Sequence, residues 1–100
     1  MSRAELFRDL FGATSGALRV PALRVLIEAY PECVTTERLA ATLWPARPPT
    51  RPADTVRVVL SQMRHDLAAR GWTISRNAGG SAPGGDREAV KARYRLVRLP

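Results

Sequence analysis

The sequence predicts a mainly α domain that ends in a β-hairpin, and so an α+β fold. Apolar residues recur at helical spacing from the N-terminus to about residue 70, and from Trp72 the period changes to two. The stretch NAGGSAPGGD (77–86) separates two alternating segments, as a glycine-rich hairpin loop does. A chain of 100 residues has material for one small core.

The first helix is expected over residues 2–11, with Ser2 as its N-cap and Gly12 as its stop. Its apolar residues are Leu6, Phe7, Leu10 and Phe11. They fit two roles, either as a cover for the open side of the domain or as a contact for another protein. GATSG then reads as a linker, so residues 1–16 are assigned to an N-terminal helix with its linker and residues 17–100 to the main domain.

Two further helices follow, each ended by a proline. One runs from about Pro21 to Pro31, and the next starts after Thr35, the expected N-cap, and stops at Pro45. The segment PARPPTRP (45–52) is too rich in proline for a helix or a central strand, and we expect an ordered loop.

The segment DTVRVVLSQMRHDL (54–67) predicts a helix with one apolar side, capped by Asp54 or Thr55 and ending near Gly71. Its apolar side consists of Val56, Val59, Leu60, Met63 and Leu67. The opposite side and flank carry Arg57, Val58, Ser61, Gln62, Arg64 and His65. An ordinary solvated face would be rich in Glu and Lys, whereas the only internal acid here is Asp66.

The hairpin is expected at about residues 72–99. In its first strand Trp72 and Ile74 face one way, and Thr73 and Ser75 the other. The second strand, within EAVKARYRLVRL (88–99), places Tyr94 and Leu96 on one face. Its other face carries Arg93, Arg95 and Val97.

A helix–loop–helix followed by a hairpin is the layout of a winged helix-turn-helix. In that fold the recognition helix, here residues 54–70, enters the DNA major groove. The hairpin, or wing, reaches the flanking minor groove or phosphates. Base edges are read by directional donors and acceptors and by small apolar contacts with the thymine methyl group. The expected readers on the helix are Arg57, Val58, Ser61, Gln62, Arg64 and His65. The expected contacts from the loop and the wing are Arg51, Arg76, Arg87, Lys91 and Arg93.

The distribution of charge favours a polyanionic partner, with double-stranded DNA as the first choice. Residues 1–46 contain five basic and five acidic residues, whereas residues 47–100 contain eleven basic and four acidic ones. The whole net charge of +7 therefore lies in the second half. Fifteen of the sixteen basic residues are Arg, a bias that suggests a GC-rich bacterial or phage genome.

From Leu18 to Leu96 the chain resembles the winged-helix effector domain of the OmpR/PhoB type of bacterial response regulators. The resemblance rests on PECVTTERLAATLW (31–44), TVRVVLSQMRHDL (55–67) and YRL (94–96). It implies a transcriptional regulator in which Val58, Ser61, Gln62 and Arg64 contact DNA, with wing contacts near Arg76 and Arg93. It also implies that the 45–52 loop can contact RNA polymerase.

Four departures from the family pattern bear on this expectation. Arg57 stands where the family usually has Asp, and Ser61 and Gln62 replace residues that are often basic, so a different DNA sequence is expected. The 77–86 loop is longer than a usual wing, and the glycine before Tyr94 is absent. A helix replaces the family's N-terminal strands. One hundred residues leave no room for a receiver domain, so we expect a stand-alone regulator without control by phosphorylation.

Two alternatives to a sequence-specific regulator stay open. A non-specific nucleoid-organising protein would use the same charge without reading bases. A protein-interaction module would act through the N-terminal helix. A homodimer or tandem binding is expected for useful specificity, since one winged helix reads few base pairs.

Catalysis, metals and cofactors find little support in the sequence. One His and one Cys make no expected pair, and no ligand spacing fits a metal. Gly79 and Gly84 have the separation of a phosphate loop, but Gly85 and Asp86 follow where such a loop needs Lys and Ser or Thr. No signal-peptide core or membrane-length apolar run is present, and the lone Cys33 allows no internal disulfide, so we expect a cytoplasmic, nucleoid-associated protein without a membrane partner.

Overall fold

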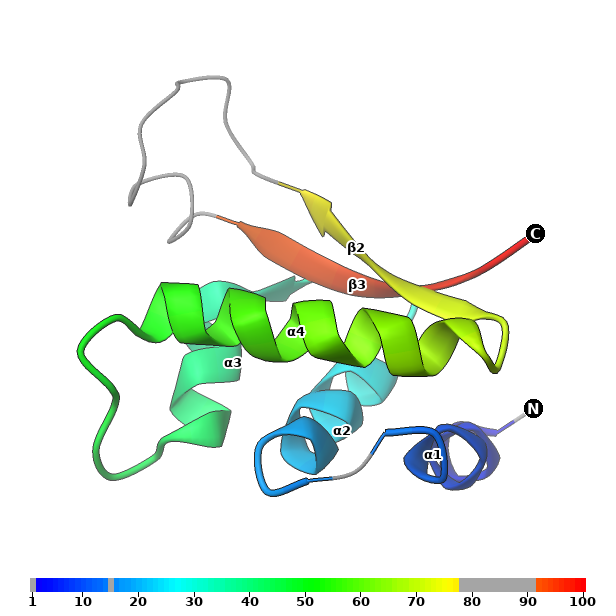
Figure 1. Cartoon of the computed structure of the whole chain (residues 1–100), viewed down its shortest axis with the longest axis horizontal. Helices are drawn as coiled ribbons and strands as arrows, with labels where there is room; N and C mark the ends of the chain where they lie inside the picture. Colours follow the sequence, from blue (N-terminus) through cyan, green and yellow to red (C-terminus); the bar gives the residue numbers. More distant parts are fainter. Residues whose placement is uncertain (1, 15, 78–91) are drawn as a thin grey trace.

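The computed structural model describes residues 2–14, 16–77 and 92–100, and within them the chain forms four helices and a three-stranded antiparallel sheet. The element bounds are α1 Arg3–Phe11, α2 Arg19–Ala29, β1 Val34–Thr35, α3 Thr36–Leu43, α4 Pro52–Ala68, β2 Trp72–Asn77 and β3 Arg93–Arg98. Figure 1 shows α4 lying lengthwise, with the β2–β3 hairpin on one side of it and α1 and α2 on the other. The expected α+β class is confirmed.

The sheet differs from the expected hairpin because it contains a third strand. The short β1 pairs with β3, which gives the order β1-β3-β2, with Val34 opposite Tyr94 and Ile74 opposite Leu96. A strand of two residues is too short to show an alternating sequence pattern, so the sequence does not predict it. It forms because it pairs with β3, about sixty residues further along the chain. The hydroxyl of Thr36 reinforces this junction by donating to the carbonyl of Ala92 at 2.7 Å.

The helix boundaries follow local chemistry, with two corrections. Ser2 and Thr35 cap α1 and α3 as expected, each accepting a backbone N–H three residues on. Helix α2 starts at Arg19, two residues before Pro21. Helix α4 starts at Pro52, so neither Asp54 nor Thr55 is its cap; Arg51 is the N-cap and makes no side-chain hydrogen bond there. Proline suits the first turn because its missing N–H would have no partner within the helix.

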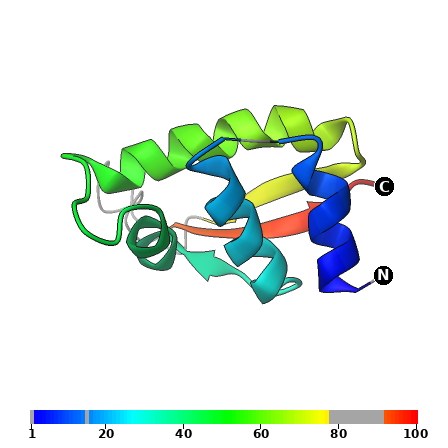
Figure 2. The same cartoon turned by 90° about the horizontal axis from the view of Figure 1, so that it is seen from below.

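One continuous core joins all four helices to one face of the sheet. The sheet contributes Val34, Trp72, Ile74, Tyr94 and Leu96, and α4 contributes its whole predicted apolar side. Helix α1 adds Leu6 and Leu10 to the same core, packing beside α2 (Figure 2). Phe7 is half-buried and Phe11 is exposed, so α1 covers the core with only part of its apolar surface.

Replacing Leu10 with Ala should lower the free energy of unfolding by about 2–5 kcal/mol, because its side chain is fully buried. Urea unfolding followed by circular dichroism measures this. The matched control is Val58→Ala, which removes apolar atoms from a residue that is 51% exposed and should stay within about 0.5 kcal/mol. Equal effects of the two substitutions would mean that α1 does not share the core of the domain.

Candidate nucleic-acid interface

Helix α4 presents one side to the core and the opposite side to solvent. Its five buried residues, Val56, Val59, Leu60, Met63 and Leu67, hold it against the body of the protein, where β2 is a direct neighbour. The rotation of the helix about its axis is therefore set by packing. All six predicted readers are exposed: Arg57, Val58, Ser61, Gln62, Arg64 and His65.

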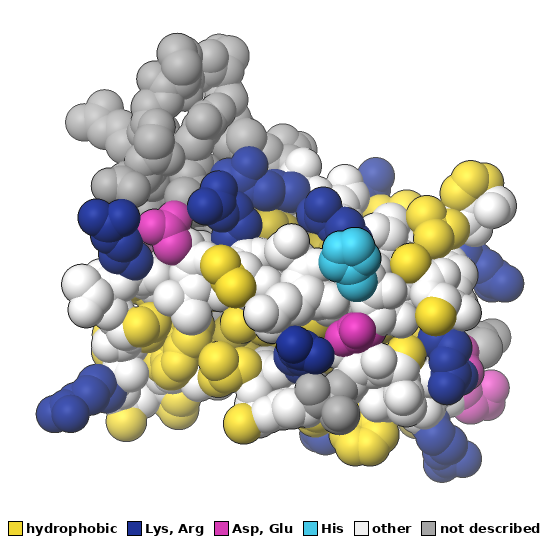
Figure 3. Space-filling model, viewed as in Figure 1, with side chains coloured by type: hydrophobic (Ala, Val, Ile, Leu, Met, Phe, Trp, Pro, Cys, Tyr) yellow, Lys and Arg dark blue, Asp and Glu magenta, His cyan; other side chains and the backbone are white. Residues whose placement is uncertain are grey.

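A groove of about 420 Å³ lies between α4 and the hairpin, and we call it the α4–hairpin groove. Its lining residues are Arg57, Val58, Leu60, Ser61, Arg64, Arg76 and Tyr94. Three of these are arginines and none is acidic. In Figure 3 the basic side chains gather along this border of α4, with the histidine on the same face. Within the described residues, none of the three arginines forms an ion pair with a carboxylate.

The hairpin brings Arg76 to this groove and directs Arg93 elsewhere. Side chains alternate along a strand, so Arg76 shares the helix-facing side of the sheet with Trp72 and Ile74, and it pairs in register with Tyr94. Arg93 and Arg95 are exposed on the opposite side of β3. Arg76 and Arg93, the two expected wing contacts that the structure describes, therefore belong to different faces of the sheet. Arg87 and Lys91 lie outside the described residues.

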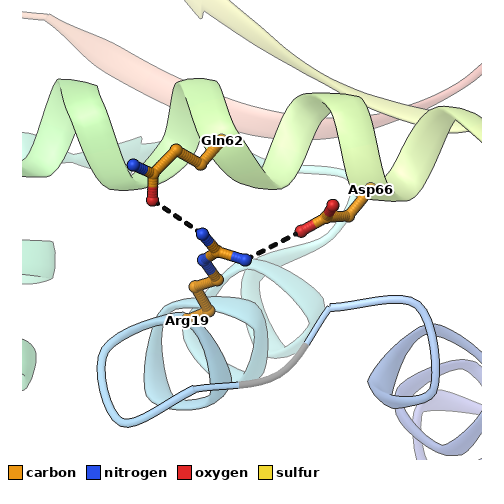
Figure 4. Close-up of polar contacts among 3 residues, drawn as sticks. All are labelled: Arg19, Gln62 and Asp66. Atoms are coloured by element: carbon orange, nitrogen blue, oxygen red, sulfur yellow. Dashed lines mark hydrogen bonds and ion pairs between the residues drawn. The ribbon is translucent and has the colours of Figure 1, made fainter.

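The other flank of α4 is held by Arg19 from the start of α2, a residue that the sequence analysis did not select (Figure 4). One guanidinium nitrogen of Arg19 donates to Oδ2 of Asp66 at 3.1 Å, and another donates to Oε1 of Gln62 at 2.8 Å. The side chains of Arg19 and Asp66 are 33% and 31% exposed. Asp66 is the only acidic residue of α4 beyond its first turn, and it faces away from the α4–hairpin groove. The ion pair with Arg19 neutralises its charge.

The contact with Arg19 also fixes the orientation of the Gln62 side-chain amide, that is, the positions of its oxygen and nitrogen. Because a guanidinium has donors and no acceptor, the atom that faces Arg19 must be the amide oxygen. The amide nitrogen, with its two N–H donors, is turned away from Arg19 (Figure 4). Gln62 therefore offers donors to anything that approaches α4 from that direction.

The loop before α4 contributes Arg51, whose side chain is 77% exposed and lies 3.8 Å from Asp54. An exposed pair at this distance contributes little to stability, so Arg51 keeps its freedom to turn toward another anion. Most of the 45–50 segment is exposed as well, and Trp44 at its start is half-buried against the core.

Among the described residues, no three His, Cys, Asp or Glu side chains form a group that could hold a metal ion. In the same part of the chain, no helix has the length and apolar character needed to cross a membrane. Cys33 is exposed and is a free cysteine. The chain matches no protein-family model, no curated protein and no solved structure.

Replacing Arg19 with Met should change the side-chain N–H₂ signals of Gln62 in a ¹⁵N correlation NMR spectrum, because the amide oxygen loses its donor. The free energy of unfolding should fall by no more than about 1 kcal/mol, since the pair is partly solvated. Arg24→Met, which removes the same charge from the same helix, is the control and should leave the Gln62 signals in place. Unchanged signals in both variants would show that Arg19 does not hold Gln62 in solution.

Proposed function

We propose that this protein is a winged-helix, sequence-specific DNA-binding regulator that inserts α4 into the major groove. The observation that carries the proposal is the α4–hairpin groove, where Arg57, Arg64 and Arg76 converge beside exposed side chains able to read bases. In that position the exposed residues of α4 would face base edges, with Arg57 and Arg64 among the donors, while Arg76 from the hairpin would meet a flanking phosphate.

The topology supports the winged-helix part of the proposal. The chain runs helix, short strand, helix, helix and hairpin, and the short strand pairs with the last strand, as in a winged helix. In that arrangement α4 is the recognition helix and the β2–β3 hairpin is the wing. This order of elements is the one expected from the resemblance to the OmpR/PhoB type of effector domain. As part of the same proposal, the chain is a bacterial or phage protein that acts in the cytoplasm, on the nucleoid.

Arg19 supports the proposal from the other flank of α4. An unpaired Asp66 would repel phosphates, and its ion pair with Arg19 reduces that repulsion. The oriented amide of Gln62 presents N–H donors, which suit the acceptors on the major-groove edge of guanine or O4 of thymine. Gln62 is thereby held ready before DNA arrives, which lowers the entropy cost of ordering it on binding.

Selection from a randomised pool of double-stranded DNA at two salt concentrations tests the function directly. We expect an enriched sequence motif, and a repeated motif would report the spacing of two bound copies. Binding that falls steeply with salt and enriches no motif would favour the non-specific, nucleoid-organising alternative. An absence of binding at both salt concentrations would contradict the proposal in either form.

Substitutions on α4 should separate base reading from general attraction. Arg57→Ala and Arg64→Ala should each weaken binding to the selected sequence by about 1–3 kcal/mol, because each removes donors to base edges. Ser61→Ala and Gln62→Ala should alter which sequence is preferred. Fluorescence anisotropy with selected and scrambled duplexes measures both effects. Arg8→Ala, with the same charge change on α1, is the matched control and should have little effect. If Arg8→Ala weakened binding as much as Arg57→Ala, net charge rather than the α4 surface would explain the affinity.

A further inference from the structure

A second groove, of about 490 Å³, lies between α1 and α2, and none of its lining residues belongs to the α4–hairpin groove. Its apolar lining comes chiefly from Phe7, Phe11 and Ile27. We call it the α1–α2 groove. In the view of Figure 1 both helices lie on the opposite side of α4 from the β2–β3 hairpin. The two grooves share no lining residue, so a molecule held between α1 and α2 leaves the α4–hairpin groove open.

The aromatic residues of this groove exceed what the fold requires. Leu6 and Leu10 already attach α1 to the core, whereas Phe11 is 45% exposed. The rings of Phe7 and Phe11 lie with their centroids 5.7 Å apart, and the guanidinium carbon of Arg24 lies 5.0 Å from the centroid of Phe7. Two aromatic rings kept at the surface and ordered by a cation form the kind of apolar site that binds a partner's side chain.

The charges around the groove indicate the partner. Its lining includes Arg3, Arg8 and Arg24 but only one acid, Glu28. The first 46 residues contain five basic and five acidic residues in total, so this local excess of positive charge does not simply reflect the basic character of the chain. Opposite charge around an apolar centre steers a partner and fixes its register.

We propose that the α1–α2 groove binds an acidic, amphipathic peptide segment of another protein, one that inserts a large apolar side chain beside Phe7 and Phe11. Carboxylates of the segment pair with Arg3, Arg8 and Arg24. A second copy of this chain fits less well, because a two-fold contact through this groove would bring the same three arginines of both copies together. The proposal does not depend on DNA binding.

Panning a phage-displayed library of random peptides against the whole chain tests the proposal. We expect the recovered peptides to combine Asp or Glu with Leu, Phe or Trp at helical spacing. In solution, Phe11→Ser and Arg24→Glu should each weaken their binding about tenfold or more, as substitutions in an interface centre do. Leu99→Ser, at another exposed apolar residue, is the control and should bind as the parent chain does. Circular dichroism confirms that each variant is folded.

Exchanging the charges of one peptide residue and one groove residue gives a more specific test. Replacing one acid of a recovered peptide with Arg should restore binding to Arg24→Glu and weaken binding to the parent chain. Three results would overturn the proposal. The first is that recovered peptides bind Phe11→Ser as well as they bind the parent chain. The second is a dimer in sedimentation that Phe11→Ser dissociates, which assigns the groove to a second copy. The third is that the chain binds phosphatidylserine vesicles rather than peptides, and that Phe11→Ser loses this binding.

Discussion

The packing of the apolar side of α4 is the constraint on which the rest of the structure depends. Five buried residues at helical spacing leave this helix only one orientation in which all of them are out of water. That orientation turns Arg57 and Arg64 toward the hairpin and Gln62 and Asp66 toward α2. The proposed recognition surface is thus a consequence of burial on the other side of the same helix. A change in the core that rotated α4 would move every proposed reader together.

Two ion pairs near α4 shape the surface charge around the helix that packing has oriented. Asp66 is paired with Arg19, and Asp9 of α1 is paired with Arg70 in the turn that follows α4. Both pairs are partly exposed, so each adds only a little to stability. Their larger effect is on the surface potential, because two carboxylates beside α4 are neutralised while the arginines of the α4–hairpin groove keep their charge. Positive potential is therefore concentrated at the groove rather than spread evenly over the helix.

Much of this arrangement was predictable from the sequence because it rests on local patterns. The helical period identified the buried side of α4, the strand period placed Tyr94 and Leu96 inward, and the N-caps at Ser2 and Thr35 follow from side-chain chemistry. The same strand period already implied that Arg76, in phase with Trp72 and Ile74, faces the helices while Arg93 does not. By this alternation, Arg76 and Arg93 belong to different faces of the sheet and do not form one set of wing contacts.

The features that the sequence did not reveal are those made by distant segments. Arg19 meets Asp66 across 47 positions, and nothing around Arg19 distinguishes it from the other arginines of the chain. Strand β1 has two residues and depends on β3 for its existence. The early start of α4 has a local cause. Asp54 and Thr55 are residue types that commonly cap helices, but Pro52 is well suited to the first turn, and the helix begins there.

The two grooves give the molecule two distinct surfaces on one core. The α4–hairpin groove draws its lining from α4, β2 and β3, whereas the α1–α2 groove draws its lining from α1 and α2. Helix α2 connects them, because Arg19 at its start contacts α4 while Arg24, less than two turns further on, lies over Phe7. A ligand that shifted α2 at one surface would therefore disturb the partner residues at the other. In a domain this small, helix α2 thus lies between the proposed DNA surface and the proposed peptide-binding groove and contacts residues of both.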